Sequence, residues 1–331
     1  MLLGGRWMVF SVQDIGVASS AARSTGNDAL WLGHAWVDGR KGMQDVDALA
    51  AQLRDTGIRD LYVHVGPLDD DGSLDASLRP KSQWFVNALH GALTQVRVSA
   101  WVGDTVPPNG GLDLESAATR ARIVAGVRSV LVDGFNGVHF DFEPVGDADP
   151  GYLALLDEAR PVVHGGGRVA GSGSDPRSSS GSGRMLSVSA EQVEPVSGGR
   201  WLMEAAVGHG TWWSRGYLRQ VASRVDQVAI MSYDTALWSP SAYAGFVRDE
   251  TRVALAVVPP NVGLVIGVPA YHSDDLTHDA AAETVDSALR GVRLALPHGT
   301  PTDRAVGVAL YVDYAATPAD WAAYRSGWVD P

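Results

Sequence analysis

The stretch DGFNGVHFDFEP, Asp133 to Pro144, has the pattern of one buried strand that ends in acids. Successive side chains of a strand point to opposite faces. One face here is apolar, and the other carries His139, Asp141 and Glu143 in that order. Three ionisable side chains on an interior face are costly to bury without a purpose. The stretch therefore predicts a strand whose polar face has a chemical role, with Glu143 at its outer end.

Apolar runs of strand length recur on both sides of this strand, with helical patterns between them. The expected strands cover residues 29–37, 60–66, 96–102, 137–142, 186–190, 226–233, 262–269 and 306–312. The helical patterns fall near residues 46–56, 83–93, 114–130, 152–164, 216–224, 241–257, 280–294 and 318–324. Eight repeats rich in Val, Leu and Ile predict a parallel α/β sheet closed into a (β/α)8 TIM barrel. No G-x-G-x-x-G follows the first strand, which weakens the dinucleotide-binding alternative.

The length of 331 residues suits a single barrel domain. We expect this domain over residues 29–331, after an irregular amino-terminal leader at residues 1–28. The Gly/Ser-rich segment at residues 171–184 cannot bury a core, so we expect a flexible loop within the domain there. The alternative is a linker between two domains, although the alternation of strands and helices resumes beyond it.

The composition excludes several classes of function. A net charge of −12 argues against nucleic acid or an anionic membrane surface as a partner. The absence of cysteine excludes disulfides, thiolate metal sites and a cysteine nucleophile. No apolar run reaches the ~18 residues of a membrane-spanning helix. We expect a monomer without a cofactor or metal, and its compartment stays open because the amino-terminal stretch makes a poor signal peptide.

The two acids of the decisive stretch lie close enough to influence each other. Like charges on Asp141 and Glu143 disfavour double ionisation, so the pKa of one carboxyl should rise. A carboxyl that stays protonated near neutral pH can act as a general acid. The alternative is a buried structural network in which His139 bridges the two carboxylates.

The same stretch resembles the fourth-strand signature of glycoside hydrolase family 18, the chitinase and endo-β-N-acetylglucosaminidase family, usually D-G-x-D-G-x-D-x-D-x-E. The resemblance implies that Glu143 is the proton donor and that Asp141 orients the 2-acetamido group of the substrate. In that family the acetamido group attacks the anomeric carbon, so no protein nucleophile is needed. The run MSYD at residues 231–234 resembles the family's M-x-Y-D, which implies that Tyr233 holds the acetamido oxygen and Asp234 bonds the substrate.

Two further strand ends agree with this resemblance. The run GVPAY at residues 267–271 resembles the family's G-[IVL]-P-x-Y, which implies that Tyr271 helps to shape the sugar site. Tyr311 stands where the family commonly has a tryptophan under the sugar, and Asp313 follows two residues later on the same face. Because the four similarities occur in the right order along the chain, they are more specific than one motif.

The chain also departs from the family pattern. The first two aspartates of the signature correspond to Asn136 and His139, and SAWVG at residues 99–103 replaces the S-x-G-G of the third strand. In the family, an aspartate at the place of His139 shares a proton with the middle acid. A histidine can still hydrogen-bond Asp141, and a protonated one would lower the pKa of that carboxyl. We therefore expect altered proton traffic in a compact, divergent member of the family.

Aromatic and histidine side chains supply the remaining candidates. Sugar rings stack on aromatic faces, and the tryptophans expected in loops or at strand ends are Trp101, Trp201, Trp212, Trp213 and Trp238. Trp238 and the Trp212–Trp213 pair are favoured, and ordinary packing is the alternative. The histidines on the first, second and fourth expected strands, His34, His64 and His139, could converge in a barrel. Lining of the pocket is favoured over a metal site for them.

Three functions stay open at this point. The first is retaining hydrolysis of β-linked N-acetylhexosamine glycans, assisted by the substrate, with Glu143 as acid and then base. The second is a carbohydrate-binding protein without hydrolysis, which Asn136 and His139 motivate. The third is a glycosidase with Asp234 or Asp313 as nucleophile, if that carboxyl lies ~5 Å from Glu143. The predicted catalytic residues are Glu143, Asp141 and Tyr233, and the predicted substrate-binding residues are His139, Asp234, Tyr271, Tyr311, Trp101, Trp238 and Asp313.

Overall fold

The computed structural model of the chain describes residues 14–165, 183–194, 212–296 and 306–331. Eight parallel strands form a closed barrel in sequence order, with β8 paired to β1. The strands are β1 (Asp28–Leu32), β2 (Ile58–His64), β3 (Arg97–Thr105), β4 (Gly137–Glu143), β5 (Met185–Ala190), β6 (Gln227–Ile230), β7 (Gly263–Pro269) and β8 (Val306–Tyr311). The prediction of a single (β/α)8 barrel is confirmed.

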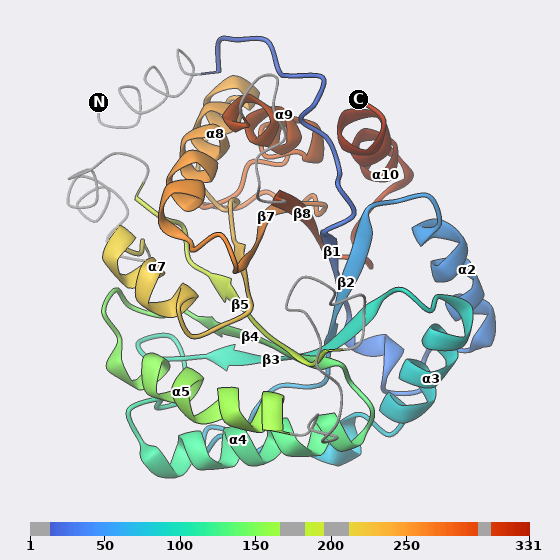
Figure 1. Cartoon of the computed structure of the whole chain (residues 1–331), viewed down its shortest axis with the longest axis vertical. Coiled ribbons are helices and arrows are strands. Elements are labelled where there is room, and N and C mark those ends of the chain that lie inside the picture. The colour runs from blue at the N-terminus through green and yellow to red at the C-terminus, as the bar shows by residue number, and fades with distance from the viewer. Residues whose placement is uncertain (1–13, 166–182, 195–211, 297–305) are drawn as a thin grey trace.

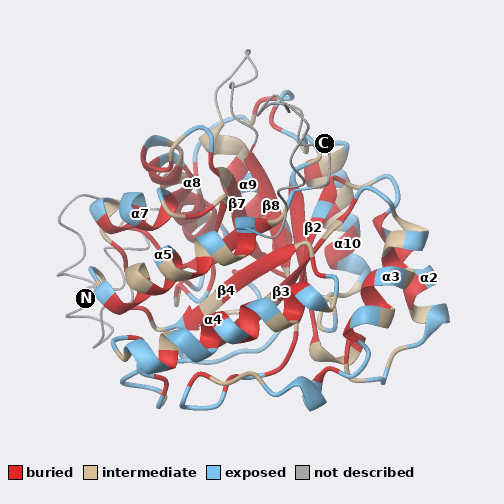
Figure 2. Ribbon diagram, turned by 60° about the horizontal axis from the view of Figure 1, so that its bottom comes forward, coloured by how far each residue is buried: buried red, intermediate tan, exposed pale blue. Residues whose placement is uncertain are grey.

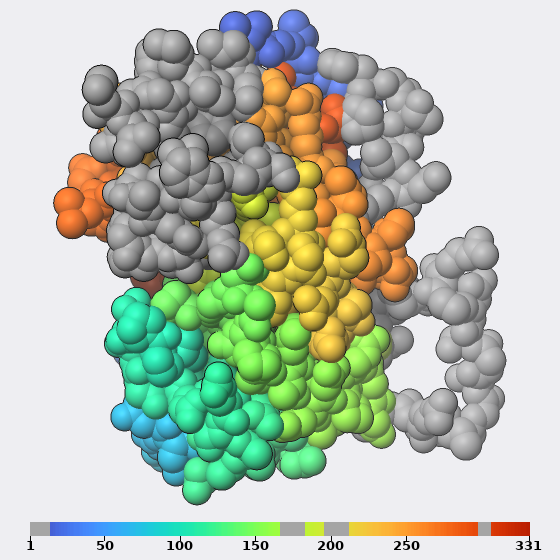
Figure 3. All heavy atoms as spheres, turned by 90° about the vertical axis from the view of Figure 1, so that its left-hand side faces the viewer, coloured from blue at the N-terminus to red at the C-terminus, as the bar shows by residue number. Residues whose placement is uncertain are grey.

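Helices form a ring around the strands (Figure 1). They are α2 (Met43–Leu53), α3 (Ser82–Ala92), α4 (Ala117–Val132), α5 (Pro150–Gly165), α7 (Arg215–Ala222), α8 (Pro240–Val257), α9 (Val285–Ala295) and α10 (Pro318–Tyr324). Short turns of 3-10 helix, η1 (His34–Trp36) and η2 (Ala76–Leu78), and a π-helical turn, η3 (Arg325–Val329), complete the described elements. Figure 3 shows one outer face of the ring, where the green atoms of α5 lie next to the yellow atoms of α7.

Several predicted boundaries are wrong by a few residues, and the local chemistry explains the shifts. The first strand was expected to reach residue 37 but ends at Leu32, because the Gly33 N–H donates to the Asp313 side chain and the chain turns into η1. Helix α4 was expected from about residue 114 but begins at Ala117, where the Ser116 hydroxyl caps the helix. Side-chain caps set such starts, and hydrophobic periodicity does not reveal them.

Some predicted segments fall partly outside the described residues. The expected Gly/Ser loop lies outside them except for residues 183–184, and so do residues 1–13 of the expected leader. Residues 14–27 contain no helix or strand. No described helix is both long and apolar enough to span a bilayer.

Buried side chains form one layer between strands and helices and a second layer inside the barrel. Figure 2 shows the strands and the inward faces of the helices as buried. Phe140 and Phe142 of β4 belong to the outer layer, as their alternation predicts. Trp31 of β1 and Tyr62 of β2 fill the interior, where the ring of His139 stacks on Tyr62 at a centroid distance of 3.8 Å. Aromatic side chains therefore fill the barrel interior around His139.

A buried carboxyl group joins the first strand to the last and to the carboxyl-terminal helix. Asp28 is fully buried and accepts hydrogen bonds from the Val308 N–H at 2.9 Å and the Trp328 Nε1–H at 2.9 Å. The hydroxyls of Ser24 and Tyr324 donate to its other oxygen at 2.6 and 2.7 Å. Four donors therefore depend on one carboxyl at the point where the barrel closes.

Replacing Asp28 with alanine is expected to lower the free energy of unfolding by about 3–5 kcal/mol, because it leaves buried donors without an acceptor. Urea denaturation followed by circular dichroism measures the change. The control is Asp47→Ala on the exposed side of α2, which should change stability by less than about 0.5 kcal/mol. Equal effects of the two substitutions would contradict the role given to Asp28.

Candidate active site

Strand β4 carries its three polar side chains on the interior of the barrel, at increasing height. His139 is completely buried, Asp141 is half-buried, and Glu143 is exposed at the carboxyl end of the strand. The register needs a glycine on β3, since a Cβ at Gly103 would lie 1.8 Å from the backbone oxygen of Asp141. The predicted alternation of this strand is thus confirmed, and Glu143 lies where barrel enzymes place reacting groups.

The carboxyl of Glu143 is adapted to hold a proton. Solvent reaches this residue, yet protein atoms surround it, and their desolvation raises its pKa well above the ordinary value. The negative charges of Asp141, Glu191 and Asp234 raise the pKa further. The predicted rise of a carboxyl pKa is therefore confirmed, and the direction favours a protonated Glu143 near neutral pH.

Asp141 is the acid next to Glu143 on the inner face of β4, and the two carboxyls influence each other's pKa. Burial raises the pKa of Asp141, while the side chains of Ser189 and Trp101 and the carboxyl of Glu143 act to lower it. The charge of Asp141 and its interaction with Glu143 raise the pKa of Glu143. Of the two carboxyls, Glu143 is therefore the one on which this interaction favours a proton.

His139 differs from the expectation in two respects. Its hydrogen-bond partners are Trp31, Ser187 and Ser189, at 3.2, 2.8 and 3.0 Å, and Asp141 is not among them. Burial lowers its pKa to about 3, which keeps the ring neutral. Because its side chain is completely buried, it contacts no ligand in this conformation, and the prediction that it lines the pocket is wrong.

Three tyrosines, at or just beyond the carboxyl ends of β6, β7 and β8, form one wall of the mouth, by which we mean the open end of the barrel at the carboxyl ends of its strands. The ring of Tyr233 stacks on Tyr311 at 5.4 Å and meets Tyr271 edge-on at 6.0 Å. Burial raises the pKa of Tyr233, and the charges of Tyr311, Asp141 and Glu143 contribute to the rise. The structure thus brings together the three tyrosines that the sequence proposed from three different strand ends.

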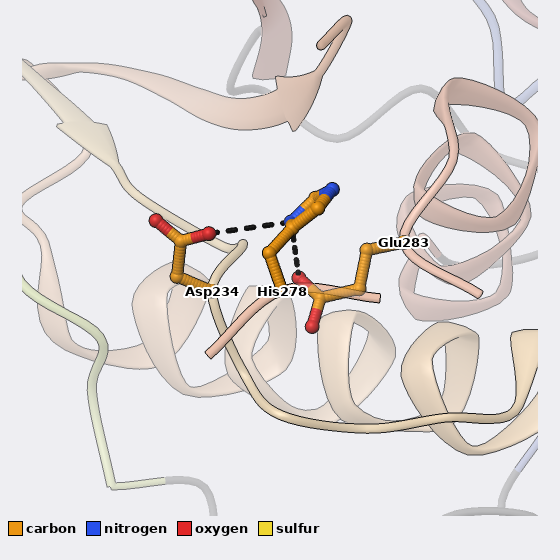
Figure 4. Close-up of side chains that lie close together, drawn as sticks. All are labelled: Asp234, His278 and Glu283. Atoms are coloured by element: carbon orange, nitrogen blue, oxygen red, sulfur yellow. Dashed lines mark ion pairs between the residues drawn. The ribbon is translucent and has the colours of Figure 1, made fainter. Parts of the chain in front are cut away.

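Asp234 is held by residues from the loop after β7 (Figure 4). It accepts a hydrogen bond from the Tyr271 hydroxyl, and the Nδ1 atom of His278 lies 3.2 Å from its carboxylate. The same nitrogen lies 3.4 Å from the carboxylate of Glu283, which also accepts from the backbone and hydroxyl of Thr235. Asp234 is half-exposed, whereas the side chains of His278 and Glu283 are fully buried. This cluster orients one carboxylate toward the mouth.

The charge of His278 balances the two carboxylates of the cluster. Burial alone would lower its pKa, but hydrogen bonds and charges of Asp234 and Glu283 raise it to about 9. The three side chains are also the group, among the described residues, whose ligand-type atoms all lie within 4.8 Å and could hold a metal ion. With His278 protonated, a proton occupies this position between the acids. The sequence analysis missed Glu283 because its partner Thr235 is 48 residues away in the chain.

A cavity of about 600 Å³ opens beside the tyrosines, on the side of β1, β2, β3 and β8. His34, His64, Trp101 and Asp313 are among the residues that line it, whereas Glu143 is not. Trp101 links the cavity to the tyrosine wall, since its ring lies 6.0 Å from that of Tyr311. The cavity therefore lies to one side of Asp141 and Glu143, neither of which lines it.

The carboxylate of Asp313 is occupied by structural contacts. One oxygen accepts from the Gly33 N–H and the other from the Trp36 Nε1–H, each at 2.7 Å. Asn136 has a similar structural role, because its side chain accepts from the Val98 N–H at 2.8 Å. These contacts disfavour Asp313 as a nucleophile and explain Asn136 without a ligand.

The tryptophan candidates divide into buried and exposed ones. Trp212 and Trp213 are 8% and 1% exposed, so the expectation that this pair stacks on a sugar is wrong. Packing explains them, since the Trp213 Nε1–H donates to the Val145 carbonyl at 2.8 Å. Trp238 is 51% exposed and stays a candidate, whereas Trp201 lies outside the described residues.

Glu191 is an acid of the site that the sequence analysis missed. It directly follows β5, is buried, and accepts from the Val145 N–H at 3.1 Å. Burial raises its pKa to about 8, and the charge of Asp141 adds to the rise. Its place just past the carboxyl end of an expected strand was a usable signal.

No family model and no curated protein sequence matches the chain. The chitinase from Chromobacterium violaceum has a similar structure, with a TM-score of 0.57 and 18% identity, over 94% of this chain and 99% of that chain. The spore cortex-lytic enzyme SleL from Bacillus cereus gives 0.56 and 13%, over 93% and 75%. A glycoside hydrolase family 18 N-acetylglucosaminidase from Paenibacillus barengoltzii gives 0.55 and 13%, over 91% and 99%. Because the sequence identities are this low, the structural similarity shows a shared fold and nothing more.

Replacing His278 with asparagine is expected to destabilise the protein in a pH-dependent manner. A histidine whose pKa is raised to about 9 stabilises the fold fully below about pH 6.5 and loses this contribution as pH rises through 9. The loss should be of order 2 kcal/mol near pH 6, less than the full shift implies because Asp234 is half-exposed. Urea denaturation at about pH 6 and about pH 10 measures it.

The matched control is His272→Asn, since His272 contacts Asp320 at 2.9 Å but has a half-exposed side chain. We expect a loss below about 1 kcal/mol there. A His278 effect that does not diminish at high pH would refute the protonated bridge.

Proposed function

We propose that the chain is a glycoside hydrolase of the family 18 type, acting on β-linked N-acetylhexosamine glycans. The observation that carries the proposal is the place of Glu143 at the carboxyl end of β4, on the same face as Asp141 and with a pKa that burial and the charge of Asp141 raise. The similarity of the fold to chitinases and an N-acetylglucosaminidase supports the same conclusion.

The proposed reaction has two steps. In the first, Glu143 gives its proton to the glycosidic oxygen while the acetamido oxygen of the substrate attacks the anomeric carbon. Asp141 accepts a hydrogen bond from the acetamido N–H, and the Tyr233 hydroxyl donates to the acetamido oxygen. The leaving sugar departs and a cyclic oxazolinium ion forms. In the second step the Glu143 carboxylate takes a proton from water, which opens the ring at the anomeric carbon with net retention.

The remaining predicted residues shape the sugar site in this proposal. Asp234, held by Tyr271 and His278, presents a carboxylate to sugar hydroxyls. Tyr311 lies under the sugar, and the other predicted contacts are Trp101, Trp238 and Asp313. The alternative in which Asp313 is the nucleophile is weakened, because both of its oxygens hold structural donors.

Replacing Glu143 with glutamine is expected to lower the rate of hydrolysis of chitin oligosaccharides by about 10²–10⁴-fold, because an amide cannot transfer the proton. Binding of the oligosaccharides should change little, since the amide keeps the size of the side chain. Reducing-end formation and isothermal titration calorimetry measure the two quantities. The control is Glu115→Gln, at an exposed residue outside the site.

Near-wild-type hydrolysis by the Glu143→Gln variant would exclude Glu143 as the acid. If the wild-type protein binds the oligosaccharides but releases no reducing ends over days, the carbohydrate-binding alternative is correct.

The rate of hydrolysis should also depend on pH, and its fall on the alkaline side should occur at a higher pH than the pKa of an ordinary glutamate. Glu143 must be protonated to act as the acid, so activity is lost as pH rises through its elevated pKa. On the acid side, activity is lost as Asp141 becomes protonated. A kcat profile between about pH 3 and about pH 10 measures both limbs. An alkaline limb at the pKa of an ordinary glutamate, about 4.3, would contradict the raised pKa of Glu143.

A further inference from the structure

Three side chains beside the mouth bring together ligand atoms of the kind that bind a transition metal (Figure 4). Asp234 follows β6, and His278 and Glu283 lie between β7 and α9. One ligand atom from each side chain lies within 4.8 Å of the other two. The side chains of His278 and Glu283 are completely buried, whereas that of Asp234 is 46% exposed. The cluster therefore reaches solvent on the side of Asp234.

Buried polar atoms of this cluster lack the hydrogen bonds that burial normally requires. Both ring nitrogens of His278 and the Oε2 atom of Glu283 have no hydrogen-bond partner of good geometry among the described residues. The Nδ1 atom lies 3.2 Å from Asp234 and 3.4 Å from Glu283, but neither contact has the angle of a good hydrogen bond. One N–H can serve only one of the two oxygens well. An ion bonded to all three side chains would satisfy Nδ1 and Oε2 together.

The spacing of these atoms matches the edges of a tetrahedral zinc site. Ligand atoms about 2.0–2.1 Å from a zinc ion at tetrahedral angles lie about 3.3–3.4 Å from one another. The distances from His278 Nδ1 to the two carboxylates, 3.2 and 3.4 Å, are of this size. The ligand types agree with zinc, because calcium and magnesium prefer sites built of oxygen atoms, whereas an imidazole nitrogen suits zinc.

The charges of the cluster also favour a divalent cation. When the ring of His278 is neutral, Asp234 and Glu283 leave two negative charges, which one such ion neutralises. Among the ion pairs of the described residues, none joins either acid to an arginine or a lysine. The proton that raises the charge of His278 occupies the same place, so the ion and the proton compete for Nδ1. Stability measured with a chelator present reports the proton alone.

Neighbouring groups hold the three ligands in position. The Oε1 atom of Glu283 accepts hydrogen bonds from the N–H and the hydroxyl of Thr235 at 3.0 and 2.8 Å, which leaves Oε2 for a ligand contact. The Tyr271 hydroxyl donates to Asp234, and its ring stacks on His278 at a centroid distance of 4.2 Å. Outer contacts of this kind fix the orientation of ligands in metal sites.

We infer that Asp234, His278 and Glu283 form a zinc site whose remaining coordination position faces solvent beside the tyrosine wall. Three protein ligands and a fourth position for water or a substrate oxygen are the arrangement of an open zinc site. The inference goes beyond the proposed function, because the cluster is separate from Glu143 and Asp141 and its test needs no hydrolysis. No ligand spacing in the sequence predicts the site, since its ligands come from two different loops.

Isothermal titration calorimetry of the untagged, chelator-treated protein with Zn²⁺ alone, at about pH 8, tests the inference. We expect one equivalent to bind with a dissociation constant below about 10 μM. Glu283→Gln keeps the size of the side chain and an oxygen for Thr235 but removes a charged ligand. Its affinity for Zn²⁺ should fall at least about 100-fold, and His278→Asn should have the same effect.

His272→Asn is the matched control, since it removes a half-exposed histidine that contacts Asp320 at 2.9 Å outside the cluster. Its affinity for Zn²⁺ should equal that of the wild-type protein. Thr235→Val removes only an outer hydrogen bond to Glu283 and should weaken binding about 10–100-fold. The inference is overturned if the wild-type protein binds no Zn²⁺, or if the His278 and Glu283 variants bind it as well as the wild-type protein.

A second measurement does not depend on the folding of any variant. Wild-type crystals soaked in Zn²⁺ should give an anomalous-diffraction peak about 2.0–2.2 Å from His278 Nδ1 and from an oxygen of each carboxylate. Peaks only at other places on the surface would show adventitious binding and refute the site. Zinc binding by a protein that hydrolyses no chitin oligosaccharide defeats the proposed function alone, whereas hydrolysis by a protein that binds no zinc defeats the zinc site alone.

Discussion

The site depends on the alternation of side chains along β4 within a closed barrel. In such a barrel the inward side chains near the carboxyl ends of all strands meet in one small volume. Strand β4 adds a vertical order to this volume, from the buried His139 through the half-buried Asp141 to the exposed Glu143. Burial disfavours charge, so the histidine stays neutral at the bottom and the pKa values of the two acids above it are raised.

Buried glutamates hold the loops of the mouth in a recurring way. Glu191 accepts from the backbone N–H of Val145 after β4, and Glu250 of α8 accepts from that of Val193 after β5. Glu283 does the same for Thr235 after β6. Each of these loops has lost its strand partners, so a carboxylate oxygen replaces the missing acceptor. These buried acids thus hold the backbone of the loops, including the one that carries Tyr233 and Asp234, and the charge of Glu191 also raises the pKa of Glu143.

The fold and the central residues could be predicted because their signals are local. Eight apolar runs fix the strand count, period-two alternation fixes the face of Asp141 and Glu143, and strand ends mark Tyr233, Tyr271 and Tyr311. The predictions that failed concern side chains whose surroundings are set by residues distant in the sequence. The burial of Trp213 results from packing against the loop after β4, and the bridge from Asp234 to Glu283 joins residues from different loops. The neutrality of His139 follows from its complete burial, beside Trp31 and Ser187, which no spacing rule connects to it.

The most direct test of the central claim is a crystal structure of the Glu143→Gln protein with an N-acetylglucosamine oligosaccharide bound. The account predicts that a glycosidic oxygen lies within hydrogen-bonding distance of residue 143. It also predicts that the acetamido group of the adjoining sugar lies between Asp141 and Tyr233. A sugar seated only in the cavity near His34 and Trp101, with its acetamido group away from Asp141, would contradict the account.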